Sequence, residues 1–68
     1  MYDIKLKDGR YLSDVNIVDI YNDYDEIYYR HILVNPNKKV RIVNLQNKTL
    51  CKVTGSDIEY CCKAYGAE

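Results

Sequence analysis

Apolar and polar residues alternate at the start of the chain, which is the pattern of a β-strand with one buried face. Tyr2, Ile4 and Leu6 alternate with three charged residues. The Asp8-Gly9 pair that follows is typical of a two-residue hairpin turn, because glycine accepts the positive φ that such a turn requires. The pattern therefore predicts a hairpin whose first strand buries Ile4 and Leu6.

The second predicted strand is long, and the parity of its apolar positions changes. A two-residue turn pairs Leu6 with Tyr11, and the buried face then continues through Val15 and Ile17. After Ile17 the apolar positions move by one residue, to Val18. A shift of one residue predicts a β-bulge or a sharp bend at this point. A bent strand of this kind allows a small sheet to curl around a single core.

Three more segments have the composition of strands. Residues 27–34, 40–45 and 49–53 are rich in β-branched and apolar side chains, and the turn sequences at 35–38 and 46–48 separate them. In the first of these segments we expect Tyr28, Ile32 and Val34 to point inward.

The C-terminal segment changes from a period of two to a helical period. Ser56 and Glu59 have the spacing of a capping box, and apolar residues recur three and four positions apart from Ile58 to Tyr65. Gly66 then occupies the position at which a helix commonly ends. We expect a short helix at about Asp57–Tyr65. The alternative is a 3₁₀ turn at 56–57 followed by a further strand.

These elements predict a mostly β fold in a single domain that spans residues 1–68. We expect a five-stranded, strongly bent antiparallel sheet or an SH3-like small barrel, with the short C-terminal helix packed over an open end of the sheet. The predicted core consists of Ile4, Leu6, Val15, Ile17, Ile20, Ile32, Val40, Ile42, Leu50, Val53, Ile58 and Cys61.

The segment Ile4–Leu12, with the sequence IKLKDGRYL, resembles the first hairpin of Sm-like and other SH3-like small barrels. The chain lacks the N-terminal helix of Sm proteins and has Ser13-Asp14 where those proteins have a glycine. It also lacks their RNA-site signatures. The resemblance therefore implies a fold, and no binding residue is transferred from it.

Composition and charge indicate what kinds of surface the protein presents. The chain has eight tyrosines and no other aromatic residue. A tyrosine ring has an apolar body and a polar tip, which suits the boundary between core and solvent. Residues 1–26 carry seven acids and three bases, whereas residues 27–56 carry six bases and no acid. Segregated charge of this kind steers partners even though the net charge is zero.

The loop after the second predicted strand interleaves tyrosines with acids, a composition typical of protein-binding surfaces. A solvated loop of ordinary turn residues is the alternative interpretation. The leading hypothesis is a non-catalytic protein-interaction module. The short length of the chain and its Tyr-, Asn-, Ile- and Lys-rich composition suggest a small regulator or inhibitor from a phage or mobile element. The predicted partner-binding residues are Tyr21, Asp23, Tyr24, Asp25, Glu26 and Tyr28.

The basic segment supports a second hypothesis, a small barrel that binds nucleic acid. Cations at hairpin tips grip phosphates while bases stack on nearby rings. Lysines on edge strands also protect against aggregation without binding anything. The predicted nucleic-acid-binding residues are Arg30, Lys38, Lys39, Arg41 and Lys48.

No catalytic, metal or cofactor signature accompanies these surfaces. His31 and the three cysteines are zinc ligands by type, but their spacing is not that of a structural zinc site. We expect at most one of Cys61 and Cys62 to be buried, which leaves the other as a candidate reactive thiol. With neither a signal peptide nor a membrane-spanning apolar run, we expect a reduced cytoplasmic protein, with self-association through an unpaired sheet edge as a further possibility.

Overall fold

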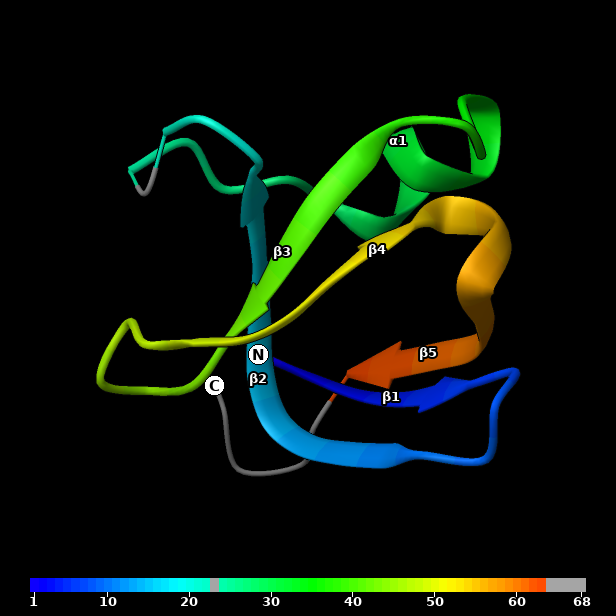
Figure 1. Ribbon diagram of the computed structural model, residues 1–68, viewed down its shortest axis with the longest axis horizontal. Coiled ribbons are helices and arrows are strands. Elements are labelled where there is room, and N and C mark those ends of the chain that lie inside the picture. The colour runs from blue at the N-terminus through cyan, green and yellow to red at the C-terminus, as the bar shows by residue number, and fades with distance from the viewer. Residues whose placement is uncertain (23, 64–68) are drawn as a thin grey trace.

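Five antiparallel strands form one unclosed sheet in the order β4-β3-β2-β1-β5, as Figure 1 shows. The computed structural model describes residues 1–22 and 24–63. The strands are β1 (Tyr2–Leu6), β2 (Tyr11–Asp19), β3 (Lys39–Val43), β4 (Thr49–Thr54) and β5 (Ile58–Lys63). The helices are α1 (Tyr29–Val34) and the 3₁₀ turn η1 (Gly55–Asp57). The mostly β class is therefore confirmed.

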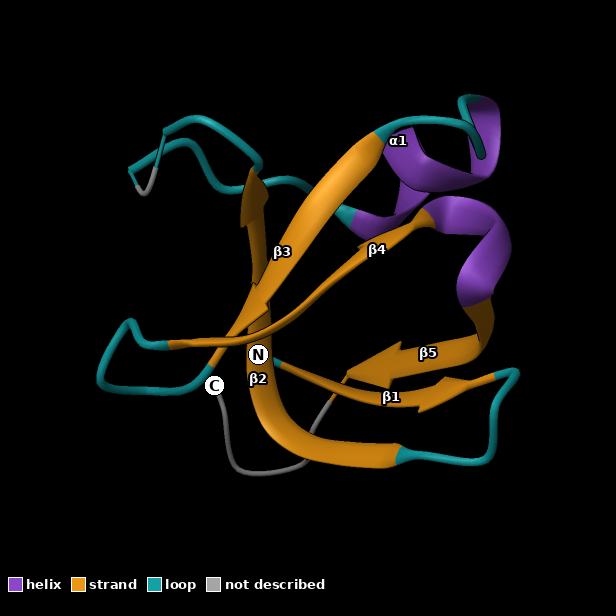
Figure 2. Ribbon diagram, in the orientation of Figure 1, coloured by secondary structure: helices purple, strands orange, loops and turns teal. Residues whose placement is uncertain are grey.

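The long strand β2 bends, and this bend organises the sheet. Its first half pairs with β1, and its second half turns away to run beside β3 (Figure 2). The pairing with β1 shifts between Ile4↔Leu12 and Tyr2↔Val15, so β2 holds one extra residue there, and Asp14 has a positive φ of 55°. A bulge of this kind increases the local twist and bends the strand.

The bulge lies earlier than the sequence predicts. The pairing of β2 with β3 is regular from Asn16 to Asp19, so the bulge predicted after Ile17 is wrong in position. Ile17 and Val18 are both buried although they point to opposite faces, because both faces of the sheet are covered there. Where both faces are covered, consecutive residues are apolar, and the sequence pattern then resembles a change of parity.

The first hairpin also has a different register from the predicted one. Tyr11 pairs with Lys5 and not with Leu6. The Gly9 N–H donates to the Leu6 carbonyl (3.0 Å), and the Leu6 N–H donates to the Arg10 carbonyl (2.8 Å). Gly9 has a φ of +100° and ends a three-residue loop, a common alternative to the predicted two-residue turn.

The segment 27–34 is not a strand, which corrects the sequence prediction. Ile27 donates its N–H to the Ile17 carbonyl (2.9 Å), and the chain then forms the helix α1. Ile32 is the buried residue of this helix, whereas Tyr28 and Val34, which were expected inside, are 49% and 85% exposed. The buried pair Ile27 and Ile32 is five residues apart, which fits neither a strand nor a continuous helix.

The predicted C-terminal helix is also wrong. The 3₁₀ turn η1 is followed by β5, which pairs with β1 from Leu6↔Ile58 to Tyr2↔Lys63, so the alternative prediction describes residues 55–63 correctly. The capping box uses Thr54 and Asp57: the Thr54 N–H donates to the Asp57 carboxylate (2.9 Å). The free edge of β1 offers β5 a full ladder of hydrogen bonds, which outweighs local helical spacing. Tyr65 and Gly66 lie outside the described residues.

The core lies on the inner face of the bent sheet, beneath α1 and η1. Nine of the predicted core residues are buried there; Ile20 and Cys61 are half-buried, and Cys61 packs against the core. Leu50 is 46% exposed, because a register shift opposite Ile42 and Val43 turns it outward. The buried residues that sequence reasoning missed are Val18, Ile27 and Val43.

Candidate functional site

The loop that follows β2 is held by short-range hydrogen bonds. The Asp19 carboxylate accepts the Tyr21 N–H (2.9 Å), and the Asn22 side chain accepts the Tyr24 N–H (3.0 Å). The Asp19 N–H donates to the Asp25 carbonyl (2.9 Å), and Glu26 lies opposite Val18 in an antiparallel bridge. Asp and Asn favour such turns because their side chains bond to the backbone two residues on. These hydrogen bonds therefore fix the backbone of the loop, which returns along β2 and serves as a frame for its side chains.

Two aromatic rings project from this frame into solvent. Tyr21 is 92% exposed and Tyr24 is 94% exposed, and both acids that follow, Asp25 and Glu26, are exposed as well. Asp23 lies outside the described residues. In Figure 1 the loop extends from the end of β2, away from α1 and η1.

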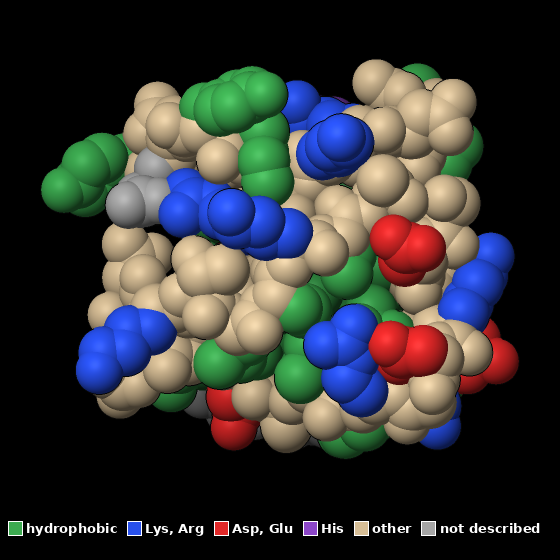
Figure 3. Space-filling model, viewed as in Figure 1, with side chains coloured by type: hydrophobic (Ala, Val, Ile, Leu, Met, Phe, Trp, Pro, Cys, Tyr) green, Lys and Arg blue, Asp and Glu red, His purple; other side chains and the backbone are tan. Residues whose placement is uncertain are grey.

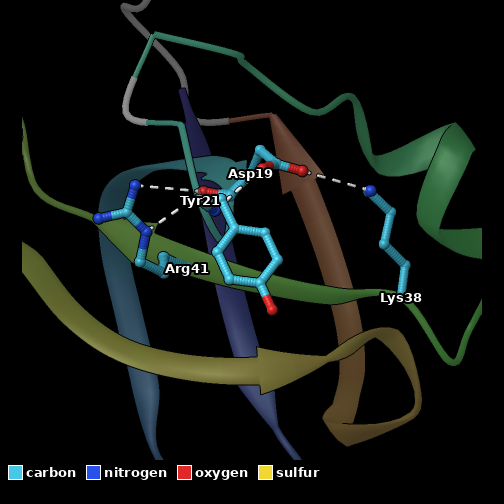
Figure 4. Close-up of polar contacts among 4 residues, drawn as sticks. All are labelled: Asp19, Tyr21, Lys38 and Arg41. Carbon is cyan, nitrogen blue, oxygen red and sulfur yellow. Dashed lines mark hydrogen bonds and ion pairs between the residues drawn. The ribbon is translucent and has the colours of Figure 1, made fainter.

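The loop residues face two different hollows. Tyr21 lies over β3 and points toward β4 (Figure 4), where it lines a hollow of about 420 Å³ with residues that include Lys39, Lys52, Val53 and Thr54. Ile20 and Asp57 complete this lining. Among the described partner-binding residues of the prediction, Tyr21 alone lines this hollow.

Glu26 and Tyr28 line the second hollow, of about 570 Å³, together with Tyr2, Tyr29 and Arg30. Met1 and Lys63 complete its lining. The Arg30 guanidinium lies 5.3 Å from the centre of the Tyr28 ring, at cation–π distance. Arg30 thus belongs to the α1 side of the molecule and is separated from the other predicted cations.

Asp19 binds two of the predicted cations (Figure 4). Its carboxylate lies 3.4 Å from the Lys38 ammonium, and its backbone carbonyl accepts hydrogen bonds from Nε (3.2 Å) and Nη2 (3.1 Å) of Arg41. The Tyr21 N–H, followed by Lys38, lowers the pKa of the Asp19 carboxyl below its ordinary value. Lys38 and Arg41 are therefore partly engaged within the protein.

The outward positions of β3 and β4 carry a group of positive charges, which we name the basic face: Lys39, Arg41 and Lys52. These residues alternate with the buried Val40, Ile42 and Val53. Arg41 pairs directly with Lys52 across the two strands, and Lys39 pairs with Thr54. Like charges placed directly opposite each other destabilise a sheet. Figure 3 shows Lys and Arg side chains spread over this part of the surface.

Lys52 was absent from the predicted nucleic-acid-binding set, although its position between Cys51 and Val53 marks it as outward-facing on a strand. The predicted residue Lys48 is exposed at the tip of the β3–β4 hairpin. Lys39 and Lys52 have no acidic partner among residues 1–22 and 24–63. Within the basic face, these two lysines are therefore available to an external anion.

The cysteines do not assemble into a site. Cys61 packs against the core, Cys62 is exposed on the opposite face of β5, and Cys51 is half-buried on β4. Burial raises the pKa of Cys51 and raises that of Cys61 to about 12. In the part of the chain that the structure describes, no three His, Cys, Asp or Glu residues come together to hold a metal ion. His31 is exposed on α1.

Comparison with known proteins found no relative of this chain. No family model matches the chain, and no match to a curated protein or to a solved structure was found. Within the described residues, neither helix has the length and apolar character needed to cross a membrane. Function must therefore be argued from the surfaces themselves.

Proposed function

We propose that this chain is a non-catalytic protein-interaction module whose contact surface is the loop after β2. The observation that carries the proposal is the nearly complete exposure of Tyr21 and Tyr24 on an ordered frame. A tyrosine ring contributes a large apolar area with few rotatable bonds, so burying it against a partner gains free energy at a small cost in entropy.

The acids beside the rings supply specificity. Asp25 and Glu26 are exposed and have no cationic partner among the described residues. They suit a partner that presents Lys or Arg around an apolar depression, with charge setting the orientation and the rings supplying the affinity. Tyr28 extends this surface toward α1, and Asp23 belongs to the same loop in the sequence.

The wider role is proposed on composition alone. A small cytoplasmic regulator or inhibitor encoded by a phage or mobile element agrees with the short chain and its Tyr-, Asn-, Ile- and Lys-rich sequence. An SH3-like small barrel stays the prediction for the finer fold class.

Affinity capture from a lysate of the encoding organism tests the proposal. The immobilised wild-type chain is compared with Tyr24→Ala, with the double charge reversal Asp25→Lys/Glu26→Lys, and with Tyr60→Ala. Tyr60 is an exposed ring on β5 and serves as the matched control. We expect a protein that the wild type and the Tyr60 variant retain and that both loop variants lose.

All four substituted side chains are exposed, so we expect each variant to keep the fold. Thermal unfolding of each variant checks this. A captured protein that both loop variants retain at wild-type levels would place the contact elsewhere. The partner itself is identified by mass spectrometry, and its affinity is then measured by calorimetry with the purified proteins.

A further inference from the structure

We infer that the basic face, together with the ring of Tyr21, binds single-stranded nucleic acid. This activity goes beyond the proposed protein contact, with which it shares the ring of Tyr21, and adds the outward side chains of β3 and β4. It rests on one juxtaposition: an exposed aromatic ring lies over strands whose outward side chains are Lys39, Arg41 and Lys52.

The ring is placed where a base can stack on it. Tyr21 projects from the loop across β3 toward β4, and its backbone is fixed by the bond from its N–H to Asp19. The hollow beside it, about 420 Å³, lies within the range of roughly 300–1,000 Å³ of small-ligand clefts. Half-buried Ile20 and Thr54 also line it, so one base on the ring meets an apolar and a hydroxyl-bearing wall.

The cations are placed where the phosphates of a stacked strand would lie. Lys39 and Lys52 line the same hollow as the ring. Arg41, which pairs with Lys52 across the strands, is turned toward the Asp19 carbonyl and the Thr49 hydroxyl (3.3 Å). Arg41 therefore adds fixed positive charge, while the two lysines remain available for direct contact.

A single strand fits these groups better than an acidic peptide does. Carboxylate side chains use the lysines but leave the face of the ring unused, whereas nucleotides engage both. Asp57 also lines the hollow and repels phosphates that lie close to it, so we expect the phosphates to lie on the side of the lysines.

Fluorescence anisotropy with a labelled twelve-nucleotide oligothymidylate and the matching oligouridylate tests the inference at about 50 mM salt, with a salt series above it. We expect binding that weakens steeply with salt. Lys39→Gln/Lys52→Gln should weaken binding about tenfold or more and reduce the salt slope by about 1.4, roughly 0.7 for each lysine that no longer neutralises a phosphate of a single strand. Lys7→Gln/Lys63→Gln removes equal charge from other exposed positions and should change affinity less than about twofold.

The ring is tested separately. Tyr21→Ala should weaken binding roughly 5- to 150-fold, the range expected when one stacked aromatic ring is removed, and Tyr21→Phe should retain it. Tyr24→Ala, which disrupts the proposed protein-binding surface, should bind the oligonucleotide normally, so the two proposals fail independently. A duplex of the same sequence should compete poorly because its bases are already stacked.

Three results would overturn the inference: no anisotropy change at low salt with either oligonucleotide, equal affinity across all variants, or displacement of the oligonucleotide by polyglutamate at the same charge concentration. The last result would identify an acidic-peptide site on the same face.

Discussion

Gly55 lies directly against Ile32, and this contact joins η1 to α1. A side-chain Cβ at Gly55 would overlap Cγ2 of Ile32 and would lie 2.9 Å from Cα of Pro36. Ser56 donates its N–H to the Pro36 carbonyl (2.9 Å), which fixes the same approach. The Pro36 backbone cannot move aside as a flexible side chain can. The absence of a side chain at residue 55 is therefore what allows the two helical turns to meet over the core.

Gly55→Ala should destabilise the fold. We expect the free energy of unfolding to fall by about 1–3 kcal/mol, the usual cost of overpacking a filled core. Guanidinium unfolding followed by circular dichroism measures it, with Gln46→Ala at the exposed β3–β4 turn as a control that should stay within about 0.5 kcal/mol of the wild type. An unchanged midpoint for Gly55→Ala would show that η1 and α1 separate at little cost.

Gly9 should be sensitive for a different reason. A Cβ at this position meets nothing within 4 Å, but the backbone has a φ of +100°, which L side chains rarely adopt. Gly9→Ala should therefore cost about 1–2 kcal/mol through backbone strain alone. Gly9→Asn should cost less, because asparagine tolerates left-handed conformations better. Equal losses for the two variants in the same unfolding assay would contradict this account.

Asp19→Asn should destabilise the protein at neutral pH and have no effect in acid. The pKa of the Asp19 carboxyl is lowered in the folded state, so the charged form stabilises the fold above the ordinary pKa of about 4. This contribution is lost as the pH falls through the folded-state pKa. Thermal melts from about pH 7 to about pH 2.5 should show the curves of the wild type and of Asp19→Asn converging at the acid end.

The natural control for this experiment is Asp25→Asn, which removes an exposed carboxylate from the same loop without removing an ion pair. Its melting temperature should follow that of the wild type at every pH. A constant gap between wild type and Asp19→Asn down to the acid end of the series would assign the effect of the substitution to altered packing and not to charge.

The two adjacent cysteines should differ in reactivity. Burial raises the pKa of Cys61 to about 12, so almost none of it is thiolate at mildly alkaline pH, whereas Cys62 is exposed. Iodoacetamide should modify Cys62 at least about tenfold faster than Cys61 in the native protein. Mass spectrometry of the labelled peptides measures both rates. Cys62→Ser should remove the fast phase and Cys61→Ser should leave it, and equal native rates would contradict the buried placement of Cys61.

Local sequence chemistry predicted part of this fold. The alternation at Ile4 and Leu6, the Asp8-Gly9 turn and the strands around Val40 and Val53 were all recognised, because neighbouring residues determine them. The hairpin register was not, because Gly9 can end either a two-residue or a three-residue loop and the sequence does not distinguish them.

The two errors of secondary structure have a common physical origin. Ile58 and Cys61 are three residues apart, which suits a helix, yet a shift in pairing between Lys5 and Leu6 puts both against the core in a strand. Similarly, Ile27 and Ile32 reach one core from an extended residue and a helical one. In both segments long-range packing, and not local period, decides the element.

The exposure of Tyr21 and Tyr24 could be anticipated from their acidic surroundings, but the hollow that Tyr21 lines with Lys39 and Lys52 could not. Only the pairing of β3 with β4 places Lys52 opposite Arg41, and only the end of β2 brings the Asp19 carbonyl to Arg41. These relationships join residues about ten to twenty positions apart, beyond the reach of a local pattern.

The pairing of Tyr2 with Lys63 brings the two ends of the described chain together as neighbours in the sheet. A tag, fluorophore or surface attachment at Met1 will therefore crowd the corner that holds Tyr28 and Arg30 and leave Tyr21 and the basic face accessible. The same proximity invites circular permutation: a short linker from Lys63 to Met1, with new termini opened between Gln46 and Asn47, would move both attachment points away from that corner.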